Sequence, residues 1–222
     1  MKNLLFWMVL IVGIVALIGS CAKKDEESAA SAAADNTTST TSTTKYMSTT
    51  TTASGSITMG DDTLSGVYAT SCLTGSLITI FVNANVWPSE VKAYGNVFVV
   101  TGSDNISIEL YTFTDTSCST SSMSYKTVSD NVTVGSASGS NYPVTYNRQT
   151  QAITVHTTAA ETTTETLYSN TLDWTVGTPR VISQLGQFKY GLWTLSGTTW
   201  YEGSDSTSAT PTSAGTVPHV KQ

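Results

Sequence analysis

Between residues 64 and 203 the chain is a succession of short β-prone runs separated by turn residues, and this rhythm limits the folds that it can adopt. The candidate strands are 64–72, 77–82, 97–100, 106–115, 125–134, 142–147, 152–158, 166–176, 189–195 and 198–201. Helices do not alternate with these runs, so nothing indicates a parallel sheet. Because the runs follow one another closely and end in the hairpin signal Ser196-Gly197, we predict an all-β, antiparallel up-and-down barrel. A β-sandwich is the alternative.

One short helix is expected within this series of strands. It would begin at Thr178-Pro179, because proline is favoured at the first position of a helix. Val181, Leu185 and Phe188 then recur at helical spacing. We therefore expect a helix here rather than a strand.

The clearest alternation lies in residues 106–115. Ile106, Ile108 and Leu110 share one face of this predicted strand, and Glu109 lies on the other. Burying each aliphatic side chain is worth about 1.5–3 kcal/mol, whereas burying an unpaired carboxylate costs several kcal/mol. We therefore expect the aliphatic set in the core and Glu109 on the outward face, solvated or partly under a neighbouring loop, where its replacement by alanine would change stability little.

The N-terminus has the layout of a secretory signal. Lys2 provides a positive charge, residues 4–18 are almost wholly apolar, and the small residues Gly19 and Ser20 come before Cys21. As an α-helix, residues 4–18 would rise about 22 Å, which is short of the roughly 30 Å of hydrocarbon in a bilayer. A cleaved signal therefore explains this stretch better than a membrane-spanning helix.

The five residues Leu17-Ile18-Gly19-Ser20-Cys21 resemble the lipobox of bacterial lipoproteins, in which an aliphatic residue and two small residues come before an invariant cysteine. The resemblance implies that the chain is cut between Ser20 and Cys21 and that Cys21 carries a lipid. Two or more acyl chains hold a protein on a membrane almost permanently. We therefore expect a lipid-anchored protein of the cell envelope, outside the cytoplasm, whose partner through this lipid is the membrane.

Composition divides the chain into four segments. Residues 1–20 are the expected lipoprotein signal peptide, and residues 57–203 are the expected barrel domain. Residues 21–56 are rich in Ala, Ser and Thr, and we predict a disordered tether because they offer too little apolar surface to fold. Residues 204–222, again rich in Ser, Thr and Pro, are predicted to be a disordered tail.

The chain contains three cysteines. If Cys21 carries lipid, Cys72 and Cys118 remain as an even pair in an oxidising compartment, for which a disulfide is the default expectation. Two free buried thiols are the alternative. Metal ligation and cofactor binding are not expected, because neither His156 nor His219 lies at ligand spacing from a cysteine.

Two short patterns around these cysteines carry a second resemblance. They are Gly66-Val67-Tyr68, four residues before Cys72, and Phe113-Thr114-Asp115-Thr116-Ser117-Cys118. They resemble the Gly-x-aromatic and aromatic-x-Asp-x-x-Cys patterns of small uncharacterised bacterial lipoproteins with lipocalin-like barrels. The resemblance covers residues 66–203 and implies that the predicted barrel is lipocalin-like.

Charge and motifs argue against several function classes. Charged residues make up only 12% of the chain, the net charge is −6 and no basic cluster is present, so nucleic acid is not an expected partner. His156, the one histidine of the predicted domain, lies in no motif for nucleophilic catalysis. Among the acids, Glu109 beside Tyr111 and Phe113 is the most site-like group, but a solvated outer face explains it better.

An aromatic set near the end of the domain is the candidate binding site. Tyr190, Trp193, Trp200 and Tyr201 could line the mouth of a ligand pocket, although such residues more often fill or close a barrel. The first hypothesis is a non-enzymatic lipoprotein that binds a small apolar ligand in its barrel, or an envelope or host macromolecule at its surface. The rival hypothesis is an envelope glycan-directed hydrolase.

Replacing the expected acylation site tests the anchor. Cys21→Ala removes the thiol that would carry the lipid, so we expect a larger, unlipidated precursor. Metabolic labelling with a lipid analogue measures this, and unchanged label on the variant would refute the anchor. Because Ala22 rather than Asp follows the cysteine, resemblance to the sorting rule of enteric bacteria predicts the outer membrane in a cell with two membranes. Recovery wholly in the inner membrane would contradict that part.

Overall fold

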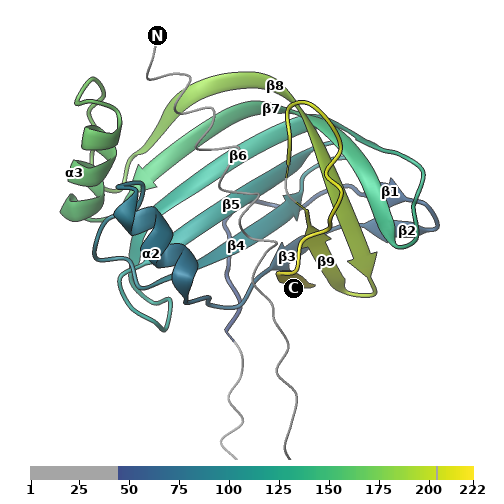
Figure 1. Cartoon of the computed structure of the whole chain (residues 1–222), viewed down its shortest axis with the longest axis horizontal. Helices are drawn as coiled ribbons and strands as arrows, with labels where there is room; N and C mark the ends of the chain where they lie inside the picture. The colour runs from purple at the N-terminus through teal and green to yellow at the C-terminus, as the bar shows by residue number, and fades with distance from the viewer. Residues whose placement is uncertain (1–44, 204) are drawn as a thin grey trace, which may run out of the picture.

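The computed structural model describes residues 45–203 and 205–222, and its centre is a closed barrel of antiparallel strands (Figure 1). The barrel strands are β3 (Val67–Ala69), β4 (Ala93–Val100), β5 (Ile106–Phe113), β6 (Ser121–Val134), β7 (Asn141–Val155), β8 (Pro179–Ser196), β9 (Thr199–Glu202) and β10 (Pro218–Lys221). Each strand pairs with the next along the chain, and β10 closes the ring by pairing with both β9 and β3. The predicted all-β, lipocalin-like up-and-down barrel is confirmed.

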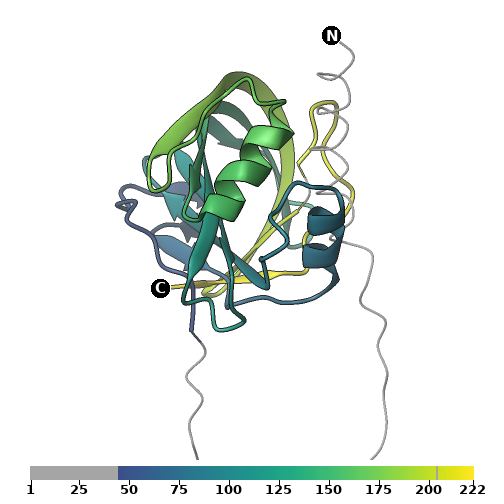
Figure 2. The ribbon, with the colours of Figure 1, turned by 90° about the vertical axis from the view of Figure 1, so that its left-hand side faces the viewer.

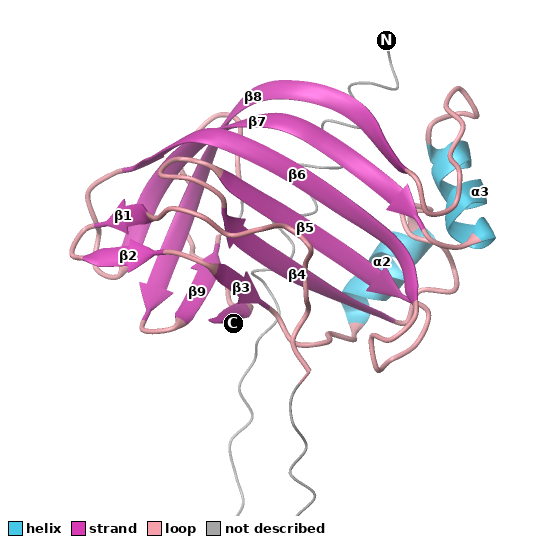
Figure 3. Ribbon diagram, turned by 180° about the vertical axis from the view of Figure 1, so that it is seen from behind, coloured by secondary structure: helices cyan, strands magenta, loops and turns pink. Residues whose placement is uncertain are grey.

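The two ends of the barrel carry different elements. The hairpin of β1 (Ile57–Met59) and β2 (Asp62–Leu64) lies at one end, and the helices α2 (Ser76–Asn83) and α3 (Thr158–Leu167) lie at the other, as Figures 1 and 3 show. In Figure 2, which faces the helix end, both helices lie in front of the strands. In the part of the chain that the structure describes, no helix has the length and apolar character needed to cross a membrane.

An aromatic core fills the interior near the hairpin end. β1 and β2 pack there against inward side chains of the barrel. The aromatic members are Tyr68, Phe98, Tyr146, Trp193 and Trp200, each at most 1% exposed. Phe98 stacks on Trp200 with ring centres 4.0 Å apart and meets Trp193 edge to face at 5.4 Å. We refer to this set as the hairpin-end core, and its tight packing means that protein side chains occupy this half of the barrel.

A second apolar core lies near the helices and explains why two strand predictions were wrong. We refer to it as the helix-end core, and its buried members are Phe81, Trp87, Val91, Tyr94, Met123, Ile153, Val155, Ala160 and Trp174. Residues 77–82, predicted as a strand, form most of α2, which turns Phe81 into this core and leaves Ile80 43% exposed. A short apolar run does not by itself distinguish a strand from a helix. Residues 166–176, the other predicted strand, contain the end of α3 and a loop whose Trp174 packs into the same core.

The helix predicted at Thr178-Pro179 is also wrong, and this segment begins β8. Pro179 is the first residue of the strand, a position where the missing N–H of proline is tolerated. Val181 and Phe188 are 56% and 47% exposed, so they form no buried helix face, and the side chain of Leu185 lies outside the described part. Register shifts between β7 and β8 interrupt the strand alternation here, which is why the spacing resembled that of a helix.

Both ends of the described chain are more ordered than the sequence indicated. The predicted disordered tail, residues 204–222, is wrong in its final part, because β10 closes the barrel. The predicted tether, residues 21–56, is wrong from residue 45 onward. Residues 45–56, which we refer to as the strap, pack along the outer face of β3, β4 and β5. Residues 21–44, the predicted signal peptide and Cys21 lie outside the described residues.

The strap is held by backbone hydrogen bonds and by one side chain that fits over a glycine. The Met47 N–H donates to the Thr70 carbonyl at 3.0 Å, and the Ser54 N–H donates to the Val100 carbonyl at 2.9 Å. The Met47 side chain lies over Gly95, where a Cβ atom would overlap it. Only glycine at this position therefore lets the strap approach β4 so closely.

Glu109 has the orientation that the sequence predicts but not the exposure. Ile106 faces the interior, as expected, and Glu109 points outward, yet Glu109 is only 3% exposed because the strap covers it. Thr49 Oγ1 donates to the Glu109 carboxylate at 2.6 Å, and Thr51 Oγ1 and Tyr111 OH donate to it as well. Glu109 is therefore covered more fully than predicted, because residues assigned to the tether supply two of its hydrogen bonds.

These contacts keep Glu109 ionised. Burial raises the pKa of Glu109, but the hydrogen bonds from Thr49, Thr51 and Tyr111 oppose it. Lys126 Nζ, 3.6 Å from Oε1, acts in the same direction as those bonds. The net result is a pKa below the ordinary value. The carboxylate thus holds the strap as a charged acceptor.

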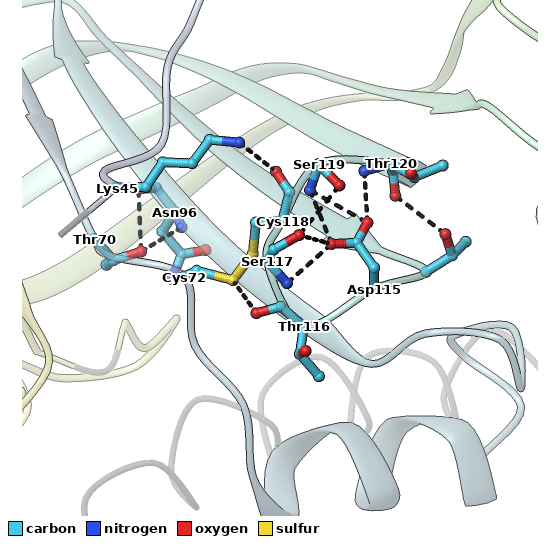
Figure 4. The surroundings of a disulfide bond; sticks show 11 residues. Lys45, Thr70, Cys72, Asn96, Asp115, Thr116, Ser117, Cys118, Ser119 and Thr120 are labelled. Atoms are coloured by element: carbon cyan, nitrogen blue, oxygen red, sulfur yellow. Dashed lines mark hydrogen bonds between the residues drawn. A yellow bond between two sulfur atoms is a disulfide. The ribbon is translucent and has the colours of Figure 1, made fainter. Parts of the chain in front are cut away.

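The predicted disulfide between Cys72 and Cys118 is confirmed, and it lies beside the start of the strap (Figure 4). It joins the chain after β3 to the loop between β5 and β6. Asp115 organises that loop by accepting the Thr120 N–H at 2.7 Å. Lys45 Nζ donates to the Cys118 carbonyl at 3.1 Å. The strap, the disulfide and the loop therefore form one connected region.

Replacing Glu109 should loosen the strap. Glu109→Ala leaves Thr49, Thr51 and Tyr111 without their shared acceptor, so we expect the free energy of unfolding to fall by about 1–3 kcal/mol. Urea unfolding followed by tryptophan fluorescence measures this change. Asp173→Ala removes an exposed carboxylate and should change stability by less than about 0.5 kcal/mol. Equally small effects of both substitutions would show that Glu109 does not hold the strap.

Candidate ligand-binding site inside the barrel

A cluster of ionisable side chains lies inside the barrel, on the wall formed by β7, β8 and β9. Its members are Tyr146 and Arg148 on β7, Lys189 on β8, Glu202 at the end of β9 and Asp205 just after β9. Cross-strand partners share a face, and Glu202 is the partner of the buried Trp193 while Lys189 is the partner of Tyr146. We refer to these five residues as the interior cluster.

The chain after β9 continues alongside β8 and so carries Asp205 inward. The Gly203 N–H donates to the Leu192 carbonyl at 2.8 Å, and Tyr190 forms a β-bridge with Ser206. A side chain at position 203 would clash, because a Cβ atom would lie 2.5 Å from the Leu192 oxygen. Glycine is therefore required where the chain passes from β9 to Asp205.

Asp205 is the charged partner of Arg148. Its Oδ2 atom forms an ion pair with Arg148 Nη2 and accepts a hydrogen bond from Tyr146 OH at 3.2 Å. The side chains of Arg148 and Asp205 are 14% and 7% exposed, so water screens the pair weakly. Burial and the Asp205 charge raise the pKa of Tyr146 well above its ordinary value. Tyr146 therefore remains a hydrogen-bond donor.

Lys189 is the second cation of the cluster and has no counter-ion. It is 2% exposed, and within residues 45–203 and 205–222 its ammonium group makes no hydrogen bond or ion pair. Burial lowers the pKa of Lys189, Arg148 lowers it further, and Asp205 partly opposes them. Because a buried charge without a partner is costly, Lys189 opposes the stability of the fold.

Glu202 is a carboxyl group that stays mostly protonated at neutral pH. Burial and the negative charge of Asp205 raise the pKa of Glu202 to about 8, although Arg148 partly opposes them. With Glu202 protonated, the formal charges of the cluster are those of two basic side chains, Arg148 and Lys189, against one carboxylate, Asp205. Their sum is one positive unit.

Several polar atoms near the cluster have no hydrogen-bond partner. They are Arg148 Nε, Ser129 Oγ, Trp193 Nε1, Trp200 Nε1 and His219 Nδ1, all buried. Ser129 is the cross-strand partner of Arg148, and Trp193 is that of Glu202, so these two side chains adjoin the cluster. Arginine and tryptophan nitrogens can only donate hydrogen bonds. Arg148 Nε, Trp193 Nε1 and Trp200 Nε1 therefore lack acceptors within the described chain.

The two histidines add no charge to the cluster. His219 on β10 packs against the Trp200 ring, and burial lowers its pKa to about 4 despite hydrogen bonds with the backbone, so it is neutral. His156 follows β7, and its Nε2 lies 3.2 Å from Ser124 Oγ. Among the described residues no third group forms a hydrogen bond with the His156 ring, so the acid that orients a catalytic-triad histidine is not in place.

The four aromatic residues predicted to line a ligand mouth are not brought together. Trp193 and Trp200 are fully buried in the hairpin-end core. Tyr190 lies on the face of β8 that is opposite to Trp193, and Tyr201 lies on the face of β9 that is opposite to Trp200. Tyr190 contacts the exposed Phe188 with ring centres 5.0 Å apart. Only Trp193 adjoins the interior cluster, through its partner Glu202.

The cluster itself was not predicted from the sequence. Arg148 falls between two runs that were predicted as separate strands, whereas the structure has one continuous β7. Asp205 falls in the segment predicted as a tail. The available signal was Lys189, which lies four residues before Trp193 and so on the same face of a strand.

No protein-family model and no curated protein sequence matches this chain. Within residues 45–203 and 205–222, no group of three or more His, Cys, Asp or Glu side chains is arranged to hold a metal ion. The interior cluster and its surroundings are therefore the features that indicate a function.

Substituting Glu202 should change how stability depends on pH. Its folded-state pKa of about 8 is above the ordinary 4.5, so the native state keeps a proton that the unfolded chain loses. Wild-type stability should therefore fall as the pH rises between these values, by up to about 1.4 kcal/mol per pH unit. Glu202→Gln removes this loss, so the variant should gain stability relative to the wild type as the pH rises.

Urea unfolding of both proteins at about pH 6.5 and pH 8 measures the effect. His219, whose folded-state pKa is about 4, is present in both proteins, so its own pH dependence cancels in the comparison. Glu161→Gln on α3 is the matched control and should show no such trend. If Glu202→Gln differed from the wild type by the same amount at both pH values, Glu202 would be ionised in the folded protein.

Proposed function

We propose that this chain is a lipid-anchored protein of the cell envelope whose barrel binds a small ligand in its interior, without catalysing a reaction on it. The resemblance of residues 17–21 to a lipobox supports the anchor. The fold supports a binding role, since eight-stranded barrels can hold one small ligand. The observation that carries the proposal is the set of buried donors without partners beside the interior cluster.

These unpartnered donors are costly to the fold. A buried donor without an acceptor lowers the free energy of unfolding by about 1–3 kcal/mol, and nearly all such groups in folded proteins are satisfied. Ser129 Oγ, Arg148 Nε and Trp193 Nε1 all face the interior from the same wall. Departures from good packing and pairing gather at functional sites. A ligand that accepts hydrogen bonds would supply the kind of partner that these atoms lack.

The surroundings of the cluster favour a ligand that also has apolar surface. The rings of Tyr146 and Trp193, with centres 6.2 Å apart, belong to the hairpin-end core and adjoin the cluster. The helix-end core lies toward the other end of the barrel. Ligand sites are lined mostly by such apolar and aromatic side chains, with a few polar groups that fix the orientation of the ligand.

Hydrolysis of envelope glycans is the second candidate function, and one observation favours it. Glu202 is protonated at neutral pH while Asp205 is ion-paired with Arg148, so two carboxyl groups differ in protonation, as a glycosidase requires. It ranks lower because Asp205 Oδ2 already binds Arg148 and Tyr146, and the Asp205 side chain is only 7% exposed. A carboxylate so enclosed offers a polymer no access.

Isolation of the full-length protein from its own membranes tests the proposed function. We expect it to carry a near-stoichiometric small molecule, which mass spectrometry identifies after unfolding. Ser129→Leu is the matched control, because the larger side chain would occupy the interior beside Arg148 and exclude the ligand. Circular dichroism checks that this control is folded.

Two results would contradict interior ligand binding. Wild-type protein that carries no such molecule, and that gains no thermal stability from an extract of envelope small molecules, would overturn interior ligand binding. Release of sugars from envelope glycan at a rate that depends on Glu202 would favour the hydrolase instead.

A further inference from the structure

We propose that the ligand of this barrel carries an anionic acceptor group, a carboxylate or a phosphate, that binds between Lys189 and Arg148. Ser129 Oγ, on the residue paired with Arg148, and Trp193 Nε1, on the residue paired with Glu202, are further buried atoms without partners next to the cluster. The inference rests on the proposed function, because it names the chemistry of a ligand bound in the same interior.

The two cations and Ser129 lie on neighbouring strands and face the same way. Ser129 on β6 is the cross-strand partner of Arg148 on β7. Lys189 on β8 is the partner of Tyr146, which is two residues from Arg148 along β7. Lys189 and Arg148 are therefore diagonal neighbours, a relation that places Cβ atoms about 7–8 Å apart. Side chains as long as these two can reach one group placed between them.

The charges of the cluster leave room for one anion. Arg148 is paired with Asp205, whereas Lys189 is 2% exposed and unpaired. Two like charges this close in a poorly screened interior repel each other. One bound anion would neutralise the excess and turn the unfavourable burial of Lys189 into a charge-assisted contact.

The unpartnered atoms also favour a ligand group that accepts hydrogen bonds over one that donates them. Arg148 Nε, Trp193 Nε1 and the ammonium of Lys189 carry hydrogens that they can only donate. Carboxylate and phosphate oxygens accept several hydrogen bonds at once. A neutral ligand would leave the Lys189 charge uncompensated, and a cationic ligand would be repelled.

Glu202 is the competing counter-ion, because it is the other carboxyl group of the cluster. If it were ionised and paired with Lys189, no anionic ligand would be needed. No hydrogen bond or ion pair joins these two side chains in the described part of the chain, and the charge of Asp205 opposes ionisation of Glu202. The stability of a Lys189 variant distinguishes the two roles.

Matched charged and uncharged probes test the inference on the full-length protein. We expect dodecanoate to change the fluorescence of the interior tryptophans, and dodecanol, its uncharged counterpart, to bind about tenfold more weakly or less. Lys189→Met should weaken dodecanoate binding by about tenfold or more and leave dodecanol binding unchanged. Lys92→Met, at an exposed lysine just before β4, is the matched control and should alter neither.

Inorganic phosphate identifies the anionic group. Displacement of dodecanoate by phosphate would support a phosphate-bearing ligand, and no displacement would support a carboxylate. Equal binding of dodecanoate and dodecanol, or no effect of Lys189→Met, would overturn the anionic class while leaving interior ligand binding intact. Failure of both anions to bind at about 1 mM would overturn it too.

Stability in the absence of ligand gives a second readout. Lys189→Met removes an unpaired buried charge, so we expect the urea midpoint to rise. If Lys189 were paired with Glu202, the same substitution would leave that carboxylate buried without a partner and lower the urea midpoint. A lower midpoint would therefore overturn the inference. Circular dichroism confirms that both lysine variants are folded.

Discussion

Four residues near the end of the chain close the barrel, and the rest of the structure depends on this closure. β10 pairs with β9 through His219 and Trp200 and with β3 through Val220 and Ala69. Without β10, β3 and β9 would be unpaired edges, and open edges promote aggregation. Closure also surrounds the interior with strands, so a polar side chain that faces inward finds its partner in the protein, in enclosed water or in a ligand.

Closure and the candidate site share one segment of chain. To reach β10, the chain must run on past β9, and in doing so it passes along β8 and brings Asp205 to Arg148 and Tyr146. The same wall carries Lys189, which nothing in the described chain neutralises. The candidate site is therefore a consequence of how the barrel is closed. The same path of the chain places ionisable side chains in the interior, which lowers the stability of the fold.

Local pattern predicted the elements whose side chains alternate regularly, and it was wrong where tertiary contacts decide. The alternation around Ile106 gave the correct inner and outer faces, and turn spacing gave the barrel. The run that forms α2 is too short to show a period, and bulges in the pairing of β8 imitate helical spacing. Asp205 and β10 lie in a segment of Ser, Thr and Pro whose order comes from pairing with distant strands, which composition does not reveal.

The two faces of the barrel wall treat a buried charge in opposite ways. On the outer face of β5, Glu109 is 3% exposed and receives hydrogen bonds from Thr49, Thr51 and Tyr111. On the inner face of β8, Lys189 is just as buried and receives no partner at all within the described chain. The chain thus provides partners for the buried charge of Glu109, and two of these partners belong to the strap. In our proposal, the unsatisfied charge is where the ligand binds. The order of the strands around the barrel separates this place from the strap, because the strap lies on β3 to β5 and the cluster lies on β7 to β9.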